Sequence, residues 1–132
     1  MNLKTLFEDQ YKVLATTSGD SCPALEFLIN GEDDTEAYRL SIIELLRTTA
    51  REGLHNLPAV VFKVANRENG IYEFKKGSIR LFFFRGNGQE IVVCTGGVRK
   101  KTQKADKQAI AKAIRAKSAY LTGNNVSAKD KK

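Results

Sequence analysis

The chain has few of the residues that bind metals or form disulfides. Its 132 residues include only one histidine and two cysteines. Cys22 and Cys94 lie far apart, outside any spacing typical of a zinc site or a redox motif. We therefore expect no zinc site, and no cofactor is expected either. We also expect a reduced, cytoplasmic protein, because structural disulfides belong to oxidising compartments.

Long apolar segments are missing as well. The sequence has no run of about 18 apolar residues, which argues against a membrane span. The N-terminal MNLKTLFEDQ lacks the apolar core of a signal peptide. No phosphate loop, Rossmann turn or nucleophile elbow is recognisable, since Gly86-Asn87-Gly88 and Gly96-Gly97 do not lead directly into a helix. The sequence thus predicts no membrane contact and no familiar nucleotide cradle.

Charge is distributed unevenly along the chain. The net charge is +7. Residues 1–70 contain seven Lys/Arg and eleven Asp/Glu, a net of −4, whereas residues 71–132 contain fifteen and four, a net of +11. A basic half on an acidic half indicates a surface for a polyanion, and nucleic acid is the commonest one. A solvated basic surface is the alternative.

Three short apolar runs dominate the second half of the chain. They are Ile71–Phe74, Ile79–Phe84 and Ile91–Cys94. Their β-branched and aromatic residues favour strands, and the glycines between them favour turns. The pattern predicts an antiparallel meander of three strands.

The first hairpin has a predictable register. A two-residue loop of Lys76 and Gly77 would place Glu73 opposite Arg80. Because side chains alternate across a strand, one face would then be apolar and the other would hold Glu73, Lys75 and Arg80. The apolar face would consist of Tyr72, Phe74, Ile79, Leu81 and Phe83. The register of the second hairpin stays open: a two-residue loop would pair Arg85 with Glu90, and a three-residue loop would not.

The remaining elements follow from caps and periodicity. We expect a strand at 10–17 and a short helix that begins with Ser21 as N-cap and ends at Asn30-Gly31. A longer helix at 34–52 would begin with an Asp33/Glu36 capping box and end at Gly53, and a strand would follow at 59–65. A last helix at about 106–121 would be capped by Asp106 or Thr102 and ended by Gly123. The two N-terminal helices would form a hairpin over one sheet face. Residues 1–123 would be a single domain and 124–132 a disordered basic tail.

Six segments of the sequence resemble a known family. They are Pro23-Ala24-Leu25-Glu26-Phe27-Leu28, Glu52-Gly53-Leu54 with Leu57-Pro58, Ile71-Tyr72-Glu73-Phe74-Lys75, Ile79-Arg80-Leu81-Phe82-Phe83-Phe84, Glu90-Ile91-Val92-Val93 and Val98-Arg99-Lys100-Lys101-Thr102-Gln103-Lys104. In this order, over about residues 20–115, they resemble the phage-derived HigB-like branch of the RelE/ParE toxin superfamily.

The resemblance implies an α+β fold with a twisted, mainly antiparallel sheet. A helical hairpin would cover one face, a concave basic face would lie on the other, and a C-terminal helix would follow. It also implies metal-free cleavage of messenger RNA, usually on the ribosome, by attack of the RNA's own 2′-hydroxyl. A helix-turn-helix antitoxin would be the partner.

The implied site residues can be named by position. Arg80 and Lys75 would be catalytic, and Arg99, Lys100, Lys101 and Lys104 would bind nucleic acid. Lys75 stands where the family usually has arginine, and no histidine or tyrosine stands at the position that some members use for proton transfer.

Structural interpretations stay open beside these roles. Arg80 could pair with Glu73, Lys75 could be an ordinary charge at a hairpin end, and 99–104 could be a solvated loop. His55 is expected to cap or pack near a helix end, and Tyr72 to lie in the core. The leading hypothesis is a toxin that acts as a ribonuclease. A non-catalytic module that binds RNA or an antitoxin is the alternative, and a gyrase-poisoning toxin is less favoured.

Overall fold

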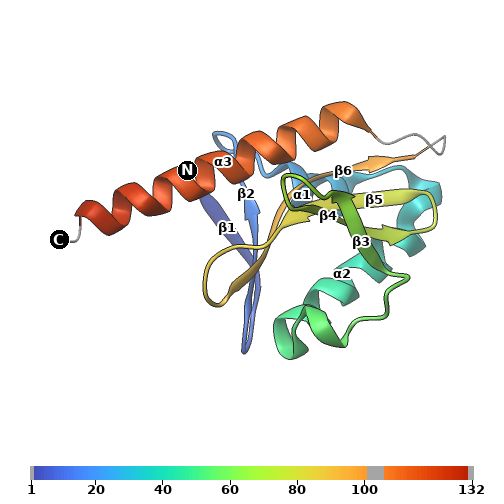
Figure 1. Ribbon diagram of the computed structural model, residues 1–132. Coiled ribbons are helices and arrows are strands. Elements are labelled where there is room, and N and C mark those ends of the chain that lie inside the picture. The colour runs from blue at the N-terminus through green and yellow to red at the C-terminus, as the bar shows by residue number, and fades with distance from the viewer. Residues whose placement is uncertain (1, 101–105, 131–132) are drawn as a thin grey trace.

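The computed structural model describes residues 2–100 and 106–130, with side chains as far as Gly123. It is an α+β fold in which helices cover both faces of one sheet (Figure 1). The elements are β1 (Leu3–Glu8), β2 (Lys12–Thr16), α1 (Pro23–Asn30), η1 (Asp33–Thr35), α2 (Glu36–Glu52), η2 (Leu54–Asn56), β3 (Phe62–Asn66), β4 (Ile71–Lys76), β5 (Ile79–Phe84), β6 (Glu90–Arg99) and α3 (Lys107–Asp130). The predicted fold class is confirmed.

The sheet has six strands in the order β1-β2-β6-β5-β4-β3. Neighbouring strands are antiparallel except for β2 and β6, which are parallel. The meander of β4, β5 and β6 is therefore confirmed. Only one N-terminal strand was expected. β1 was missed because it is an edge strand with several exposed positions, so its apolar alternation is weak.

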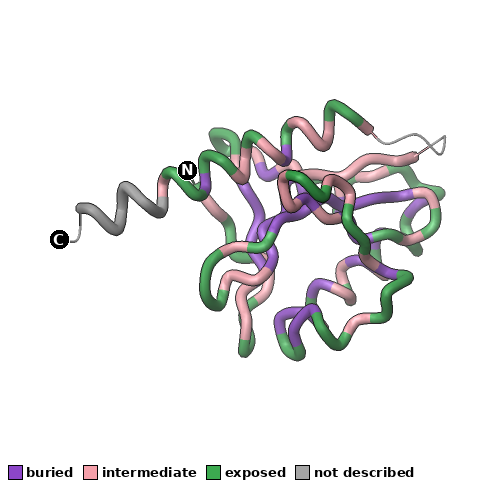
Figure 2. The backbone as a smooth tube through the Cα atoms, viewed as in Figure 1, coloured by how far each residue is buried: buried purple, intermediate pink, exposed green. Residues whose placement is uncertain are grey.

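The helical hairpin packs on one face of the sheet, as predicted. Ala24 and Leu28 of α1 and Ile42 of α2 join a core cluster with Phe74 and Phe83 of the sheet. The Phe74 and Phe83 rings stack with their centroids 4.3 Å apart. Tyr72 packs against the edge of this cluster, which agrees with its expected place in the core. Figure 2 shows the buried strands between the more exposed helices.

The opposite face of the sheet is covered by α3 and is not an open basic surface. Ala113 and Tyr120 of α3 pack with Phe82, Phe84 and Val93 in a second core cluster. In Figure 1, α3 runs across the side of the sheet opposite α2. The prediction of a concave basic face on this side is wrong. This face carries two phenylalanines whose exposure to water would be unfavourable, so a helix covers it.

The register of the β4–β5 hairpin differs from the predicted one by two residues. The loop is Gly77-Ser78, so Lys75 lies opposite Arg80. A two-residue shift leaves every side chain on its predicted face. Gly77 explains the loop, since its φ of +51° favours glycine and an added Cβ would lie 2.2 Å from the Tyr38 ring. In the second hairpin Phe84 pairs with Val93, so Arg85 and Glu90 are not paired.

The helix ends predicted from proline and glycine agree with the structure better than those predicted from polar capping residues. Pro23 begins α1, but the N-cap is Cys22, and Ser21 donates to the Glu26 carboxylate instead. The capping box is wrong, because Asp33–Thr35 forms a 3-10 turn and α2 begins at Glu36 without a side-chain cap. Gly53 ends α2 as expected, with a φ of +88°.

The C-terminal helix is longer than expected. Asp106 caps it by accepting from the backbone N–H of Ala109 at 2.9 Å, but α3 continues past Gly123 to Asp130. A single glycine in a helix costs only about 1 kcal/mol, so it does not have to end one. Leu121 is exposed and Tyr120 is buried in its place. The single domain at 1–123 and the disorder of 124–132 stay predictions.

Candidate nucleic-acid interface

One end of the sheet gathers several of the predicted site residues. Lys75 lies directly opposite Arg80, which in turn lies opposite Val98 of β6. The backbone N–H of Lys100 donates to the Ser78 carbonyl at 2.6 Å and holds the chain after β6 against the hairpin turn. Lys75, Arg80 and Lys100 therefore come together at the β4–β5 turn, which we call the hairpin end.

Arg80 is buried and its guanidinium is largely occupied. Its side chain is 10% exposed, and Nη1 donates to the carbonyls of Gly77 at 2.8 Å and Ile79 at 2.9 Å. Nε lies 2.9 Å from Oε2 of buried Glu73, but these two atoms are not aligned for a hydrogen bond. The alternative that Arg80 pairs with Glu73 is thus confirmed. The pair is diagonal, because Phe82 stands directly opposite Glu73.

Lys75 is the accessible cation of this pair of strands. Its residue is exposed, and its backbone N–H donates to the Val61 carbonyl at 2.8 Å. Its ammonium makes no ion pair with a residue that the structure describes. Lys75 can therefore offer a point charge to an anion without first losing an internal partner.

Arg99 faces the other side of the sheet. It lies opposite Ile79, and its guanidinium binds the carboxylates of Glu32 and Asp34, with Nη2 2.7 Å from Asp34 Oδ2. Hydrogen bonds to Asp34 and then Glu32 raise the pKa of Arg99 above its ordinary value. Arg99 thus ties β6 to the α1–α2 connection. Lys101 and Lys104 lie outside the described residues.

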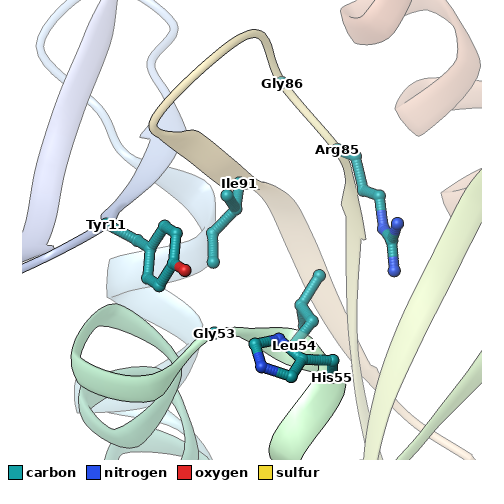
Figure 3. Close-up of a pocket in the computed structure, with 7 residues that line it drawn as sticks. All are labelled: Tyr11, Gly53, Leu54, His55, Arg85, Gly86 and Ile91. Atoms are coloured by element: carbon teal, nitrogen blue, oxygen red, sulfur yellow. The ribbon is translucent and has the colours of Figure 1, made fainter.

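A second concave region lies at the opposite end of the sheet. Tyr11, His55 and Arg85 line a cavity of about 210 Å³ together with Gly53, Leu54, Gly86 and Ile91 (Figure 3). His55 packs over Gly53 near the end of α2, as expected, but it also lines this cavity. The sequence did not predict that Tyr11, His55 and Arg85 lie together, because they come from three separate connections. The single histidine was the one local signal of this cavity.

The Cys94 thiol is poorly placed for chemistry. Burial, with a smaller effect of Cys22, raises the pKa of the Cys94 thiol, so this side chain stays protonated inside the core. Among residues 2–100 and 106–123, no group of three His, Cys, Asp or Glu side chains is arranged to hold a metal ion. In the same part of the chain, no helix is long and apolar enough to cross a membrane.

The geometry defines a class of protein. A small α+β domain with a six-stranded, mostly antiparallel sheet, a helical hairpin on one face and a C-terminal helix is consistent with the RelE-like fold. Residues 33–118 match the family described as Phage derived protein Gp49-like (DUF891). The chain belongs to this family, which is a RelE/ParE-like toxin family associated with toxin–antitoxin pairs.

The match begins just before α2 and ends within α3, so it spans both helical layers and four strands of the sheet. No curated protein matches the chain, and no solved structure does.

Proposed function

We propose that the protein is the toxin of a type II toxin–antitoxin pair, of the HigB-like branch, and that it cleaves messenger RNA on the ribosome, in the cytoplasm. The RNA's own 2′-hydroxyl would attack the phosphorus without a metal. Membership of a RelE/ParE-like toxin family is the observation that carries this proposal. The net charge of +11 over residues 71–132 supports an anionic substrate.

The hairpin end would supply the cations that this chemistry needs. Negative charge grows on the phosphorane in the transition state, and fixed positive groups stabilise it. Arg80 Nη2 makes no hydrogen bond to a described residue, while Nη1 is held by two carbonyls. A phosphate would therefore meet one rigid donor from Arg80 and the mobile ammonium of Lys75 beside it. Arg99, Lys100, Lys101 and Lys104 would bind the flanking RNA.

Mutating Arg80 to lysine tests the catalytic proposal. Arg80→Lys keeps a charge beside Glu73 and removes the planar donor, so cleavage should fall about ten- to a thousandfold, as for one electrostatic donor. The measurement is translation-coupled mRNA cleavage, or growth arrest after induction. Arg51→Lys is the matched control, because Arg51 is exposed on α2. Equal cleavage by wild type and Arg80→Lys would rule out a catalytic Arg80.

A non-catalytic module that binds RNA or an antitoxin is the second candidate. This alternative is favoured because Arg80 and Arg99 both form ion pairs with carboxylates of the same chain, which reduces the charge they offer to a substrate. A wild-type protein that binds RNA or antitoxin tightly, yet neither cleaves mRNA nor arrests growth, would establish this alternative.

The antitoxin is proposed to carry an acidic segment as well as a helix-turn-helix. Such a segment would complement Lys75 and Lys100 and block the hairpin end directly. Cross-linking of the complex should then connect acidic residues of the partner to these two lysines. Cross-links confined to α2 would show that neutralisation does not work by direct occlusion.

A further inference from the structure

The cavity at the far end of the sheet has walls from three connections (Figure 3). Tyr11 comes from the β1–β2 turn, His55 from η2 after α2, and Arg85 from the segment after β5. Leu54 and Ile91 add apolar surface beside these polar groups. Among the described residues that line the cavity, none is acidic. We call this cavity the His55 pocket.

Gly53 brings the two rings of the pocket together. A Cβ at Gly53 would lie 3.0 Å from Nδ1 of His55 and 3.3 Å from Cε2 of Tyr11. Both rings thus converge on a backbone position that has no side chain. The φ of +88° also favours glycine there. The two flat rings are therefore held close together by a local feature of the backbone.

Arg85 has donors available at the mouth of the pocket. The residue is exposed, and its guanidinium carbon lies 5.5 Å from the centroid of the Tyr72 ring. Within the described residues it forms no ion pair, unlike Arg80 and Arg99. A cation–π contact leaves the N–H donors in the guanidinium plane free for an anion. The neighbouring acid Glu90 accepts a hydrogen bond from Tyr120.

We propose that the His55 pocket binds one nucleotide of single-stranded RNA. The base stacks on the rings of Tyr11 and His55, and Arg85 donates to the adjoining phosphate. Aromatic rings and arginine are the groups that bind unpaired RNA, because every base has a flat face and every phosphate accepts hydrogen bonds. The inference rests on the proposed function in taking RNA as the ligand, but it does not depend on cleavage.

The pocket is separate from the hairpin end. Arg85 follows β5 and Arg80 lies near its start, so their backbones are about 17 Å apart at the usual rise of a strand. Alternation also points Arg80 to the face covered by α3 and Arg85 to the face covered by α2. A short RNA in the pocket therefore does not need Arg80, and the pocket would extend the surface that contacts a longer RNA.

The test measures affinity of the full chain for a short fluorescein-labelled single-stranded RNA by fluorescence anisotropy. Arg85→Ala should weaken binding about tenfold, since it removes a charge-assisted contact to phosphate. Arg115→Ala is the matched control: it removes the same charge from an exposed position on α3 and should change affinity less than about twofold. Tyr11→Leu should weaken binding about tenfold through lost stacking.

Two substitutions of His55 separate the aromatic surface of its ring from its polar nitrogen atoms. His55→Phe keeps a flat aromatic surface and should bind within about twofold of wild type, whereas His55→Ala should bind at least about fivefold more weakly. Circular dichroism of each variant checks that it folds, and His55 is exposed, so neither change disturbs the core.

The outcomes distinguish the pocket from the proposed function. If wild type binds the RNA but Arg85→Ala and Tyr11→Leu bind equally well, the pocket inference is wrong and the proposed function stands. If Arg85→Ala and Arg115→Ala weaken binding equally, only general charge is involved and the inference is again wrong. If wild type binds no RNA, the pocket inference is wrong, whereas the proposed function is decided separately by translation-coupled mRNA cleavage.

Discussion

At the scale of single residues, ion pairing divides the cations of the basic half into two kinds. Arg80 is buried against Glu73, and Arg99 is held by Glu32 and Asp34. Lys75 and Arg85 are exposed and form no ion pair with a described residue. The first kind is engaged by carboxylates of the protein itself, and the second kind is available to an anion.

Removing Arg80 should destabilise the protein strongly. Arg80→Ala leaves the buried Glu73 carboxylate without its cation, which should lower the free energy of unfolding by about 3–5 kcal/mol. Urea denaturation followed by circular dichroism measures this loss. The double variant Arg80→Met/Glu73→Leu removes both charges and should return to within about 1 kcal/mol of wild type. If Arg80→Ala alone has the same free energy of unfolding as wild type, the Arg80–Glu73 pair does not contribute to stability as proposed.

At the scale of elements, one side chain organises the connection between α1 and α2. Arg39 is 6% exposed, and its guanidinium donates to the carbonyls of Leu28 at 2.9 Å, Ile29 at 3.2 Å and Glu32 at 3.2 Å. The first two carbonyls belong to the last turn of α1, where the helix itself supplies no partner. Arg39 therefore fixes how the helical hairpin closes.

Replacing Arg39 should loosen this hairpin. Arg39→Met keeps much of the stem and removes the donors, so the free energy of unfolding should fall by about 2–4 kcal/mol through several lost charge-assisted hydrogen bonds. Thermal and urea unfolding measure the change. Arg51→Met on the same helix is the control, because its ion pair with Glu52 is exposed and should be worth less than about 1 kcal/mol. Equal losses in both variants would contradict the assignment.

The packing of α3 can be tested with a second matched pair. Ala113 is fully buried against the sheet and Ala119 is exposed on the same helix. Ala113→Asp should place a charge among Phe82 and Phe84, detach α3 and cost more than about 2 kcal/mol, whereas Ala119→Asp should cost less than about 1 kcal/mol. Dye binding to exposed apolar surface and urea denaturation report the difference. If Ala113→Asp is as stable as Ala119→Asp and binds no more dye, the burial of this face under α3 is contradicted.

At the scale of the whole molecule, the separation of charge along the chain predicts salt-sensitive binding. Phosphate neutralisation releases counterions, and each contact to single-stranded nucleic acid changes the slope of log K against log salt by about 0.7. The basic half should therefore dominate the salt dependence, wherever on its surface the RNA lies.

Reversing two lysines tests that expectation. Lys100→Glu/Lys101→Glu should weaken RNA binding and flatten the salt slope by about 1.4, since two phosphate contacts are lost. Anisotropy titrations over a series of KCl concentrations measure the slope. Lys63→Glu/Arg67→Glu gives the same change of charge in the acidic half and should leave the slope nearly unchanged. An unchanged slope in the first variant would move the RNA surface elsewhere.

The sequence by itself determined the features that depend on near neighbours. Alternation assigned Phe74, Leu81 and Phe83 to one face even though the register of the hairpin was off by two, because a shift of two residues preserves the face. Pro23 and Gly53 marked the start of α1 and the end of α2 through their own backbone preferences. The meander and the family resemblance followed from such local patterns.

Only the tertiary structure decided what distant segments do to one another. It set β2 parallel to β6 and laid α3 over Phe82 and Phe84. It also occupied Arg80 with Glu73 and the hairpin carbonyls, and it brought Tyr11, His55 and Arg85 to one cavity. Each of these depends on which apolar surfaces must be buried together, and local propensity carries no information about that choice.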